Sequence, residues 1–409
     1  MDFDLEPYLP DGRFAIAFSG GGDSTALLHA VRARNPYVLI VDHGLRGGSN
    51  LEAKDALAFA TSLGLDGQIL TWVHDGIKTG LQAKARHARY TLMGEACRAQ
   101  GITDLITGHT EDDQAETVLM RMDRHTGLRG AAGMARVVDA PIWPALAGVR
   151  VWRPLLGISR ADIRRYLDAH KLPFVDDPSN ENRDFTRIKV RDRLAADPDL
   201  RASMLALGVE ARAGLEAERA TLRSTMNNRF KIDPNGFIQM VFPVTSRFLT
   251  LCLEAVGGQG GMIARDKLAR LSERLKTENH VTVTLAGCQI IKNDRDVIII
   301  RNPGAVVARA DKAAIPSRMR LTKGIPILWD GRWWITAHLD GLSVSPLQGH
   351  ISALPAPIAA VVKDIPTKVR PTLPLIFKDT QPIAVGHGEN PALVTLESAV
   401  LSRMKAALD

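Results

Sequence analysis

The chain has 409 residues, enough for two or three domains that each bury a hydrophobic core. It has no apolar stretch of the length that crosses a membrane, and its acidic N-terminus lacks the apolar core of a secretory signal. The three cysteines lie far apart and predict neither a disulfide framework nor a cysteine-held metal, so we expect a cytoplasmic protein.

The charge of the chain is unevenly distributed. Residues 1–200 hold 25 Lys and Arg against 27 Asp and Glu, a net charge of −2. Residues 201–409 hold 27 against 18, a net charge of +9. An excess of this size indicates a polyanionic partner such as a nucleic acid, with plain solubility as the alternative.

The first predicted element is a short strand that runs into a glycine-rich turn. Residues 14–18 are uncharged and apolar, SGGGDS follows at 19–24, and apolar residues at helical spacing begin at Thr25. The amides and hydroxyls of such a turn, together with the helix dipole, can bind the phosphates of a nucleotide. An ordinary tight turn is the alternative, and neither a Walker A nor a dinucleotide motif is present. The predicted nucleotide-binding residues are Ser19, Gly20, Gly21, Gly22, Asp23 and Ser24.

A second buried strand is predicted at residues 37–43 and a third at residues 68–74. Ligands of open α/β sheets bind outside the carboxyl ends of the strands, so Asp42 and His43 are expected at the site. Between these strands, Ser49 with Glu52 three residues later is typical of a capping box that begins a helix.

The next helix, predicted at residues 81–99, carries two arginines. Arg86 and Arg89 are three residues apart and therefore lie on one face of this helix. Spacing alone favours two solvated side chains.

Acidic residues follow the fourth predicted strand. This strand, at residues 104–109, ends in His109, and the helix that follows opens with Asp112, Asp113 and Glu116. Carboxylates in a first helical turn are favourable against the dipole, so a plain helix cap is one reading. They also fit a Mg²⁺ and ATP site, because Mg²⁺ is commonly held by one or two carboxylates and the substrate phosphates.

The rest of the first half is predicted as a loop with short pieces of structure at residues 127–148, a strand at 149–156 and an amphipathic helix at 159–171. The sequence DDPSN follows at 176–180, and a basic segment comes next. Solvated arginines and phosphate contacts are equally favoured for this segment. Its basic residues are Arg183, Arg187, Lys189, Arg191 and Arg193.

Three domains are predicted. Residues 1–197 alternate strands and helices, which predicts an α/β fold with a doubly wound, mostly parallel sheet. Residues 198–303 begin with a long helix and end in antiparallel strands, an α+β pattern. Residues 304–409 contain short strand-like runs and predict a small, mostly β domain, where buried tryptophans are favoured over exposed ones that could stack on bases.

Six motifs follow one another along the first half of the chain. They are SGGGDS (19–24), VDHGLR (41–46), ARHARY (85–90), GHTEDDQAET (108–117), RPLL (153–156) and DDPSN with its trailing arginines (176–193). Together they resemble the motifs of the tRNA(Ile)-lysidine synthetases of the PP-loop ATP pyrophosphatase superfamily. The resemblance is dense over the first half, thinner through residues 284–301 and weak over the last hundred residues. Phe185 and Ile188 depart from the family pattern, which has Tyr and Asn there.

The resemblance implies the substrates, which are ATP, free L-lysine and an isoleucine tRNA with a CAU anticodon. It implies that O2 of the wobble cytidine attacks the α-phosphorus of ATP and expels pyrophosphate, after which the lysine ε-amine displaces AMP from C2. Asp23, His109 and Asp113 are then the expected catalytic residues, with Asp23 and Asp113 holding Mg²⁺. Arg86, Arg89, Arg187 and Arg191 are expected to contact tRNA or phosphates. The resemblance leaves the oligomeric state open, a homodimer included.

Three rival functions are weighed against this one. A related enzyme that thiolates tRNA would need cysteines for sulfur transfer, and three scattered cysteines argue against it. An amidotransferase or a ligase acting on a small metabolite would have no use for a basic C-terminal half. A non-catalytic tRNA-binding module would not require several carboxylates beside a polyphosphate.

Overall fold

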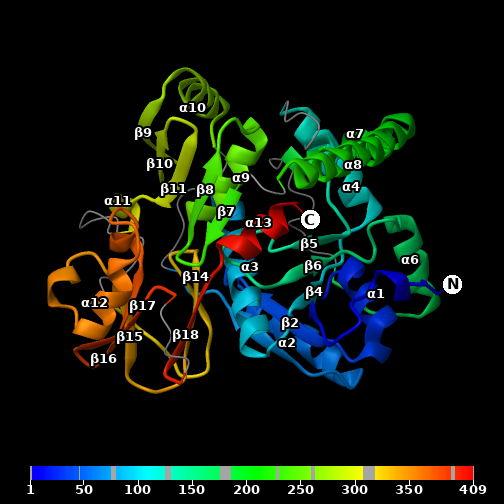
Figure 1. Cartoon of the computed structure of the whole chain (residues 1–409). Coiled ribbons are helices and arrows are strands. Elements are labelled where there is room, and N and C mark those ends of the chain that lie inside the picture. Colours follow the sequence, from blue (N-terminus) through cyan, green and yellow to red (C-terminus); the bar gives the residue numbers. More distant parts are fainter. Residues whose placement is uncertain are drawn as a thin grey trace. The chain divides into compact units, whose positions relative to one another are not determined.

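The computed structural model describes residues 2–45, 47–74, 80–124, 130–175, 186–226, 230–258, 263–306, 318–387 and 392–408. The DDPSN sequence and Phe185 lie outside the described residues. The chain divides into two compact units, Met1–Thr221 and Leu222–Asp409, and each is described by itself (Figure 1). The division into three domains at 197/198 and 303/304 stays a prediction.

The first unit is built on a six-stranded sheet. The strand order is β3-β2-β1-β4-β6-β5, and every pair is parallel except β5 with β6. This topology confirms the predicted α/β fold with a mostly parallel sheet. The strands are β1 (Ala15–Ala17), β2 (Tyr37–Asp42), β3 (Gly67–Thr71), β4 (Asp104–Ile106), β5 (Val137–Asp139) and β6 (Arg150–Trp152).

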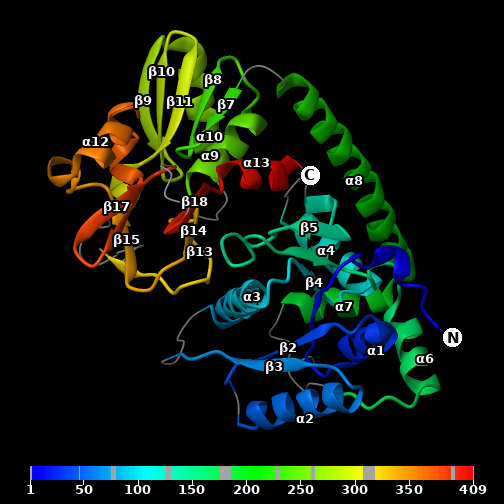
Figure 2. The ribbon, with the colours of Figure 1, turned by 60° about the horizontal axis from the view of Figure 1, so that its bottom comes forward.

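Helices cover both faces of this sheet, and side chains of successive strand residues alternate between the two faces. Ile16 and Ile106 pack with Leu27 in one core cluster, whereas Ala15 and Leu105 pack in another. Figure 2 shows α2 on one side of the sheet and α3 on the other. The helices are α1 (Gly22–Val31), α2 (Ser49–Ser62), α3 (Leu81–Ala99), α4 (Glu111–Met122), α6 (Arg160–Ala169), α7 (Thr186–Ala196) and α8 (Pro198–Met226), the last of which continues past Thr221 into the second unit.

The segment 127–148, predicted as a loop with short pieces of structure, contains β5, which pairs antiparallel with β6 at the edge of the sheet. One expectation about the first unit is wrong. The capping box predicted at Ser49 is absent from the described start of α2, where the N-cap is Gly48 and no side chain caps the helix. Gly48 has φ 91°, a left-handed conformation that favours glycine, and this places Ser49 inside the helix.

The described residues of the second unit form three antiparallel sheets with helices packed against them. A five-stranded sheet has the order β7-β8-β11-β10-β9, a four-stranded one β12-β15-β16-β17 and a three-stranded one β13-β14-β18. The strands are β7 (Phe230–Asp233), β8 (Phe237–Val241), β9 (His280–Leu285), β10 (Cys288–Asn293), β11 (Asp296–Arg301), β12 (Met319–Arg320), β13 (Ile327–Trp329), β14 (Trp333–Ala337), β15 (Leu342–Pro346), β16 (Pro374–Lys378), β17 (Gln381–Val385) and β18 (Val394–Ser398). The helices are α9 (Ser246–Val256), α10 (Arg265–Thr277), α11 (Pro303–Val306), α12 (Ala356–Lys363) and α13 (Val400–Leu408).

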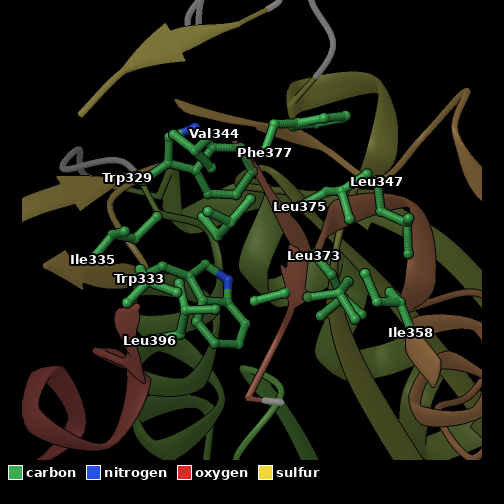
Figure 3. Packing of buried hydrophobic residues seen from close by; sticks show 14 of the residues in the cluster. Trp329, Trp333, Ile335, Val344, Leu347, Ile358, Leu373, Leu375, Phe377 and Leu396 are labelled. Atoms are coloured by element: carbon green, nitrogen blue, oxygen red, sulfur yellow. The ribbon is translucent and has the colours of Figure 1, made fainter. Parts of the chain in front are cut away.

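Tryptophans form the centre of one core of this unit. Trp329 and Trp333 are at most 1% exposed and pack with Ile335, Val344 and Leu375 (Figure 3). Both indole rings are therefore buried and cannot stack on bases, in agreement with the expectation of buried tryptophans.

No helix in the described part of the chain is both long and apolar enough to span a bilayer.

Candidate active site

The SGGGDS segment connects β1 to α1 and is braced by its own serines. The hydroxyls of Ser19 and Ser24 lie 3.1 Å apart, and Ser24 Oγ donates to the carbonyl oxygen of Gly21 at 2.9 Å. Gly20 has φ +77°, which a residue with a Cβ rarely adopts. The helix begins at Gly22, so its first amides, which have no acceptor inside the helix, face this turn. The arrangement is suited to binding an anion.

A glycine also lets the β4 strand end approach this turn closely. A Cβ on Gly108 would lie 3.2 Å from the carbonyl oxygen of Asp23, closer than most Cβ atoms come to any neighbour. The next residues, His109 and the start of α4, are consequently held beside Asp23. Residues separated by more than 80 positions thus meet at the carboxyl edge of the sheet, where ligands of such folds bind.

Asp113 is fixed by the start of α4. Thr110 is the N-cap of this helix, and its backbone amide donates to Asp113 Oδ2 at 2.8 Å. The Thr110 hydroxyl also donates to Asp113 Oδ2, at 3.1 Å, so Asp113 completes a capping box. Its other oxygen, Oδ1, is left to face basic side chains.

Arg160 joins the two predicted metal ligands. Its Nη2 donates to Asp113 Oδ1 at 2.6 Å and its Nε to Asp23 Oδ2 at 3.5 Å, while Nη1 donates to Glu116 Oε1 at 2.8 Å. Its backbone amide donates to Asp112 Oδ2 at 2.7 Å, which fixes the first residue of α6. Sequence reasoning missed Arg160, because the residue opens an amphipathic helix and carries no motif of its own.

Two of the predicted phosphate-contacting arginines pair with the same carboxylates. Arg187 donates through Nη2 to Asp113 Oδ1 and through Nε to Glu116 Oε2, both at 2.6 Å, and Arg191 Nε donates to Glu116 Oε1 at 3.1 Å. The Glu116 side chain is only 2% exposed. Three guanidinium groups therefore surround one buried carboxylate, and the segment is not a merely solvated face of α7.

Burial and charge shift the two carboxyl groups in opposite directions. Burial raises the pKa of Asp23, and the neighbouring Asp113 adds to this, although Arg160 opposes it. For Asp113, burial would raise the pKa, but Arg160, Arg187 and the Thr110 amide outweigh it, so the pKa lies below its ordinary value. Carboxyl groups with divergent pKa values are typical of functional sites.

His109 is held in a neutral form. Its Nδ1 lies 2.8 Å from the Thr107 hydroxyl. Burial lowers the pKa of His109 well below its ordinary value of 6.5, and the nearby Arg153, Arg86 and Arg89 lower it further against the opposing effect of Asp113. The imidazole therefore stays neutral at neutral pH and can accept a hydrogen bond there.

Lowering the pH from about 7.5 to about 5 should destabilise the wild-type chain more than the His109→Gln variant. The unfolded chain protonates its histidine near 6.5 whereas the folded chain does not, so this contribution to stability is present above 6.5 and is lost as the pH falls. The difference should be on the order of 1–2 kcal/mol. Urea unfolding at the two pH values measures it, and an equal loss in both proteins would contradict a neutral His109.

Asp42 and His43 lie at the carboxyl end of β2, beside β1. Asp42 Oδ1 accepts a hydrogen bond from the Gly44 amide at 3.0 Å. His43 Nδ1 is buried without a hydrogen-bond partner among the described residues, and the Trp72 ring lies 6.2 Å away, edge to face. Burial, with the charge of Arg89, lowers the pKa of His43. These two residues thus reach the edge of the sheet where they were predicted.

The donor set fits a divalent cation bound together with phosphates. Among the described residues no group of three or more His, Cys, Asp or Glu is placed to hold a metal ion alone. Asp23 and Asp113 share one cationic partner, Arg160, so a cation bound between them would take over the role of this guanidinium group. Two carboxylate oxygens and the phosphates of a nucleotide are ligands that Mg²⁺ uses.

The comparisons with known proteins show the family of the chain. Residues 4–197 match the model of the PP-loop domain. The tRNA(Ile)-lysidine synthase of Caulobacter vibrioides is 35% identical over 369 residues, which cover 89% of this chain and 83% of that protein. The tRNA(Ile)-lysidine synthase of Ruegeria pomeroyi is 34% identical, and the match covers 79% of this chain and 76% of that protein. The tRNA(Ile)-lysidine synthase of Wolbachia pipientis wMel is 30% identical, and the match covers 80% of this chain and 77% of that protein. On this similarity over most of both lengths, the chain belongs to the tRNA(Ile)-lysidine synthase family.

Proposed function

We propose that this protein is an ATP-dependent ligase that joins lysine to C2 of the wobble cytidine in a CAU-anticodon isoleucine tRNA. The proposal depends on one observation: Arg160 pairs both with Asp23, in the SGGGDS turn, and with Asp113, at the start of α4. We infer the substrates from the family, and the roles of the residues from these contacts.

The first step is the adenylylation of the base. O2 of the cytosine attacks the α-phosphorus of ATP, and the bond to the β-phosphate oxygen breaks to release pyrophosphate. Negative charge grows on the phosphoryl oxygens, where the amides after Gly21 and the hydroxyls of Ser19 and Ser24 can donate hydrogen bonds. Asp23 and Asp113 would hold Mg²⁺, which when bound neutralises phosphate charge. Asp42 and His43 would complete the ATP site from β2.

The basic residues of α7 have a second role in this proposal. Arg187 and Arg191 pair with Glu116 and Asp113, and the phosphates of ATP or tRNA would compete for the same donors. The donors of a guanidinium group match the geometry of both a carboxylate and a phosphate. The ion pairs with Glu116 and Asp113 can therefore orient these arginines before an anionic substrate binds.

The second step is the attack of the lysine ε-amine on C2, with loss of AMP. An ammonium of pKa about 10.4 must lose a proton before it can attack. Neutral His109 can accept a hydrogen bond from it, Asp113, ionised by its arginine neighbours, can attract its charge, and a carboxylate of the site would take up the proton that it loses. The free L-lysine would therefore bind on the side of His109 that faces α4.

The structure gives no support to thiolation. Cys97, Cys252 and Cys288 are all buried. Burial raises the pKa of Cys97 and of Cys288 to about 12 in each case, which suppresses the thiolate form that sulfur transfer requires. We place the protein in the cytoplasm with its tRNA substrate, and a homodimer stays a prediction.

Pyrophosphate release in the absence of lysine should separate this function from its rivals. The oxygen to be activated belongs to the RNA, so ATP and the CAU-anticodon tRNA together should release pyrophosphate before lysine is added. Lysine and ATP without tRNA should release none. Labelled lysine should then enter the tRNA in a bond that survives mild alkali, as an amine on the base does and an ester does not.

The opposite order of requirements would overturn the proposal. Release that needs lysine but not tRNA would indicate an enzyme that activates the carboxylate of an amino acid. Release with tRNA but without incorporation of lysine would indicate a different modification of the base. No release under any of these conditions would indicate a binding module.

A further inference from the structure

Three aromatic side chains gather beyond the ends of β2 and β3. They are His43, Trp72 and His74, and they are called the aromatic cluster here. The Trp72 ring lies 6.2 Å from the His43 ring, at an interplanar angle of 90°, and 4.5 Å from the His74 ring, at 46°. His74 Nε2 lies 3.3 Å from the carbonyl oxygen of His43. The aromatic cluster is therefore held together by contacts between two neighbouring strand ends.

The pairing of β2 with β3 sets the face of the sheet on which Trp72 lies. The Trp72 amide donates to the carbonyl oxygen of Asp42 at 2.9 Å, so the pairing continues past the last residue of β3. Side chains two residues apart in a strand share a face. Trp72 therefore follows Leu70, which packs in the same core cluster as Tyr90 of α3. The aromatic cluster extends this layer beyond the strand ends, on the α3 side of the sheet (Figure 2).

The indole of Trp72 is available to a further flat ring. Trp72 is half-buried, and among the described residues it belongs to no hydrophobic core cluster, unlike Trp329 and Trp333. Neither histidine ring is parallel to the indole, so neither forms the offset stack that flat rings favour. In addition, His43 Nδ1 is buried without a hydrogen-bond partner among the described residues, which costs free energy unless a ligand supplies the partner. A flat ring with polar atoms on its edge would satisfy both groups.

The positive charge near the aromatic cluster belongs to α3 and not to His43. Burial, with the charge of Arg89, lowers the pKa of His43, so this imidazole is neutral at neutral pH. The guanidinium groups of Arg86 and Arg89 lie 4.9 and 5.3 Å from the centre of the Tyr90 ring. The chemistry of Trp72 and His43 is therefore that of stacking and hydrogen bonding, which suits an uncharged ring better than a phosphate.

The order of the strands favours the base of a nucleotide as this ring. The SGGGDS turn follows β1, Asp42 ends β2 and Trp72 follows β3, and these strands are neighbours in the order β3-β2-β1. In dinucleotide-binding α/β folds with this order, the phosphates bind at the turn after the first strand and an acidic residue further on binds the ribose. Adjacent strands are about 4.7–4.9 Å apart, which places the end of β3 about 10 Å from the turn. A nucleotide that runs from the turn past Asp42 therefore brings its base to the aromatic cluster.

We infer that the aromatic cluster binds the adenine ring of ATP, with the ring stacked on the indole of Trp72. The inference rests on the proposed function, which makes ATP a substrate. It assigns to the adenine two residues, Trp72 and His74, that lie outside the six motifs. The phosphates at the SGGGDS turn and the adenine at the aromatic cluster then have separate binding residues, so the two contributions to ATP binding can be measured separately.

Ligand binding to Trp72→Ala, in the full-length chain, tests the inference. The probes are ATP and inorganic tripolyphosphate, which carries three linked phosphates without a base, and titration calorimetry measures both without lysine or tRNA. The variant should bind ATP about 10-fold more weakly, because removing an aromatic side chain that stacks on a base has an effect of this order. It should bind tripolyphosphate as the wild type does. Trp72→Phe, which keeps a flat ring, should retain most of the affinity for ATP.

Trp334→Ala is the matched control. Trp334 is also half-buried, but it lies in β14 of the second unit. Its removal should leave the binding of both probes unchanged, so a loss confined to Trp72→Ala is not a general effect of removing a tryptophan. His74→Ala repeats the test should Trp72→Ala fail to fold. This variant should also lose affinity for ATP but not for tripolyphosphate, and an unchanged affinity for ATP in it would contradict the inference.

Two results for Trp72→Ala would overturn the inference. An equal loss of affinity for ATP and tripolyphosphate would show that the substitution disturbs the phosphate turn. Unchanged affinity for both, with weaker binding of an anticodon stem-loop RNA or without it, would show that the aromatic cluster does not hold adenine. These failures are distinct from failure of the proposed function. A chain that incorporates no lysine can still bind adenine through Trp72, whereas lysine incorporation with unchanged ATP affinity in the variant would retain the function and remove the site.

Discussion

Replacing Asp113 with asparagine should reduce pyrophosphate release by on the order of 10²-fold or more while the chain stays folded. The asparagine oxygen can still accept the hydrogen bond that the Thr110 amide gives to Asp113 Oδ2 at 2.8 Å, so the start of α4 is retained. The negative charge between Arg160 and Arg187 is lost, and with it the proposed second carboxylate for Mg²⁺. The measurement is the initial rate with saturating ATP and tRNA, alongside a melting curve.

The control for this variant is Glu111→Gln, which removes a carboxylate from the same helical turn. Glu111 is 28% exposed and lies 3.6 Å from Arg201, outside the Asp23 and Asp113 pair. It should keep nearly the wild-type rate. An Asp113→Asn protein that turns over at full rate at ordinary Mg²⁺ concentration would remove Asp113 from the mechanism.

Glu116→Gln should produce the largest loss of stability among single substitutions at the site. Glu116 is 2% exposed and accepts hydrogen bonds from Arg160, Arg187 and Arg191. Breaking a buried ion pair by removing one partner costs about 3–5 kcal/mol. The arginines are 27–43% exposed and can recover hydration, so we expect about 3 kcal/mol. For a unit of this size that is a fall of about 6–12 °C in melting temperature.

Glu111→Gln again provides the comparison, because its weak pair with Arg201 should contribute less than about 0.5 kcal/mol. Differential scanning calorimetry of both variants, with the first unit's transition as the readout, makes the comparison. Equal melting temperatures for Glu116→Gln and Glu111→Gln would show that the three arginines do not depend on Glu116.

The sequence by itself determined the elements whose signals are local. The strand, turn and helix around SGGGDS depend on the spacing of apolar residues and on consecutive glycines, both of which act within a few positions. The same reasoning placed Asp42 and His43 after one strand and His109 and Asp113 after another, because parallel strands present their carboxyl ends at one edge. The family resemblance then followed from motifs that these elements carry.

Only the tertiary structure decided which charges meet. Arg160 reaches Asp23 across 137 positions, and Arg187 reaches Asp113 across 74, although neither arginine has a neighbour in sequence that marks its partner. Basic helices are commonly solvated, so composition could not separate the arginines paired with Glu116 from Arg153, which has no ion pair with a described carboxylate. The difference depends on which helix starts and strand ends share an edge of the sheet, because charge pairing is set by distances of a few ångströms in space and not by separation along the chain.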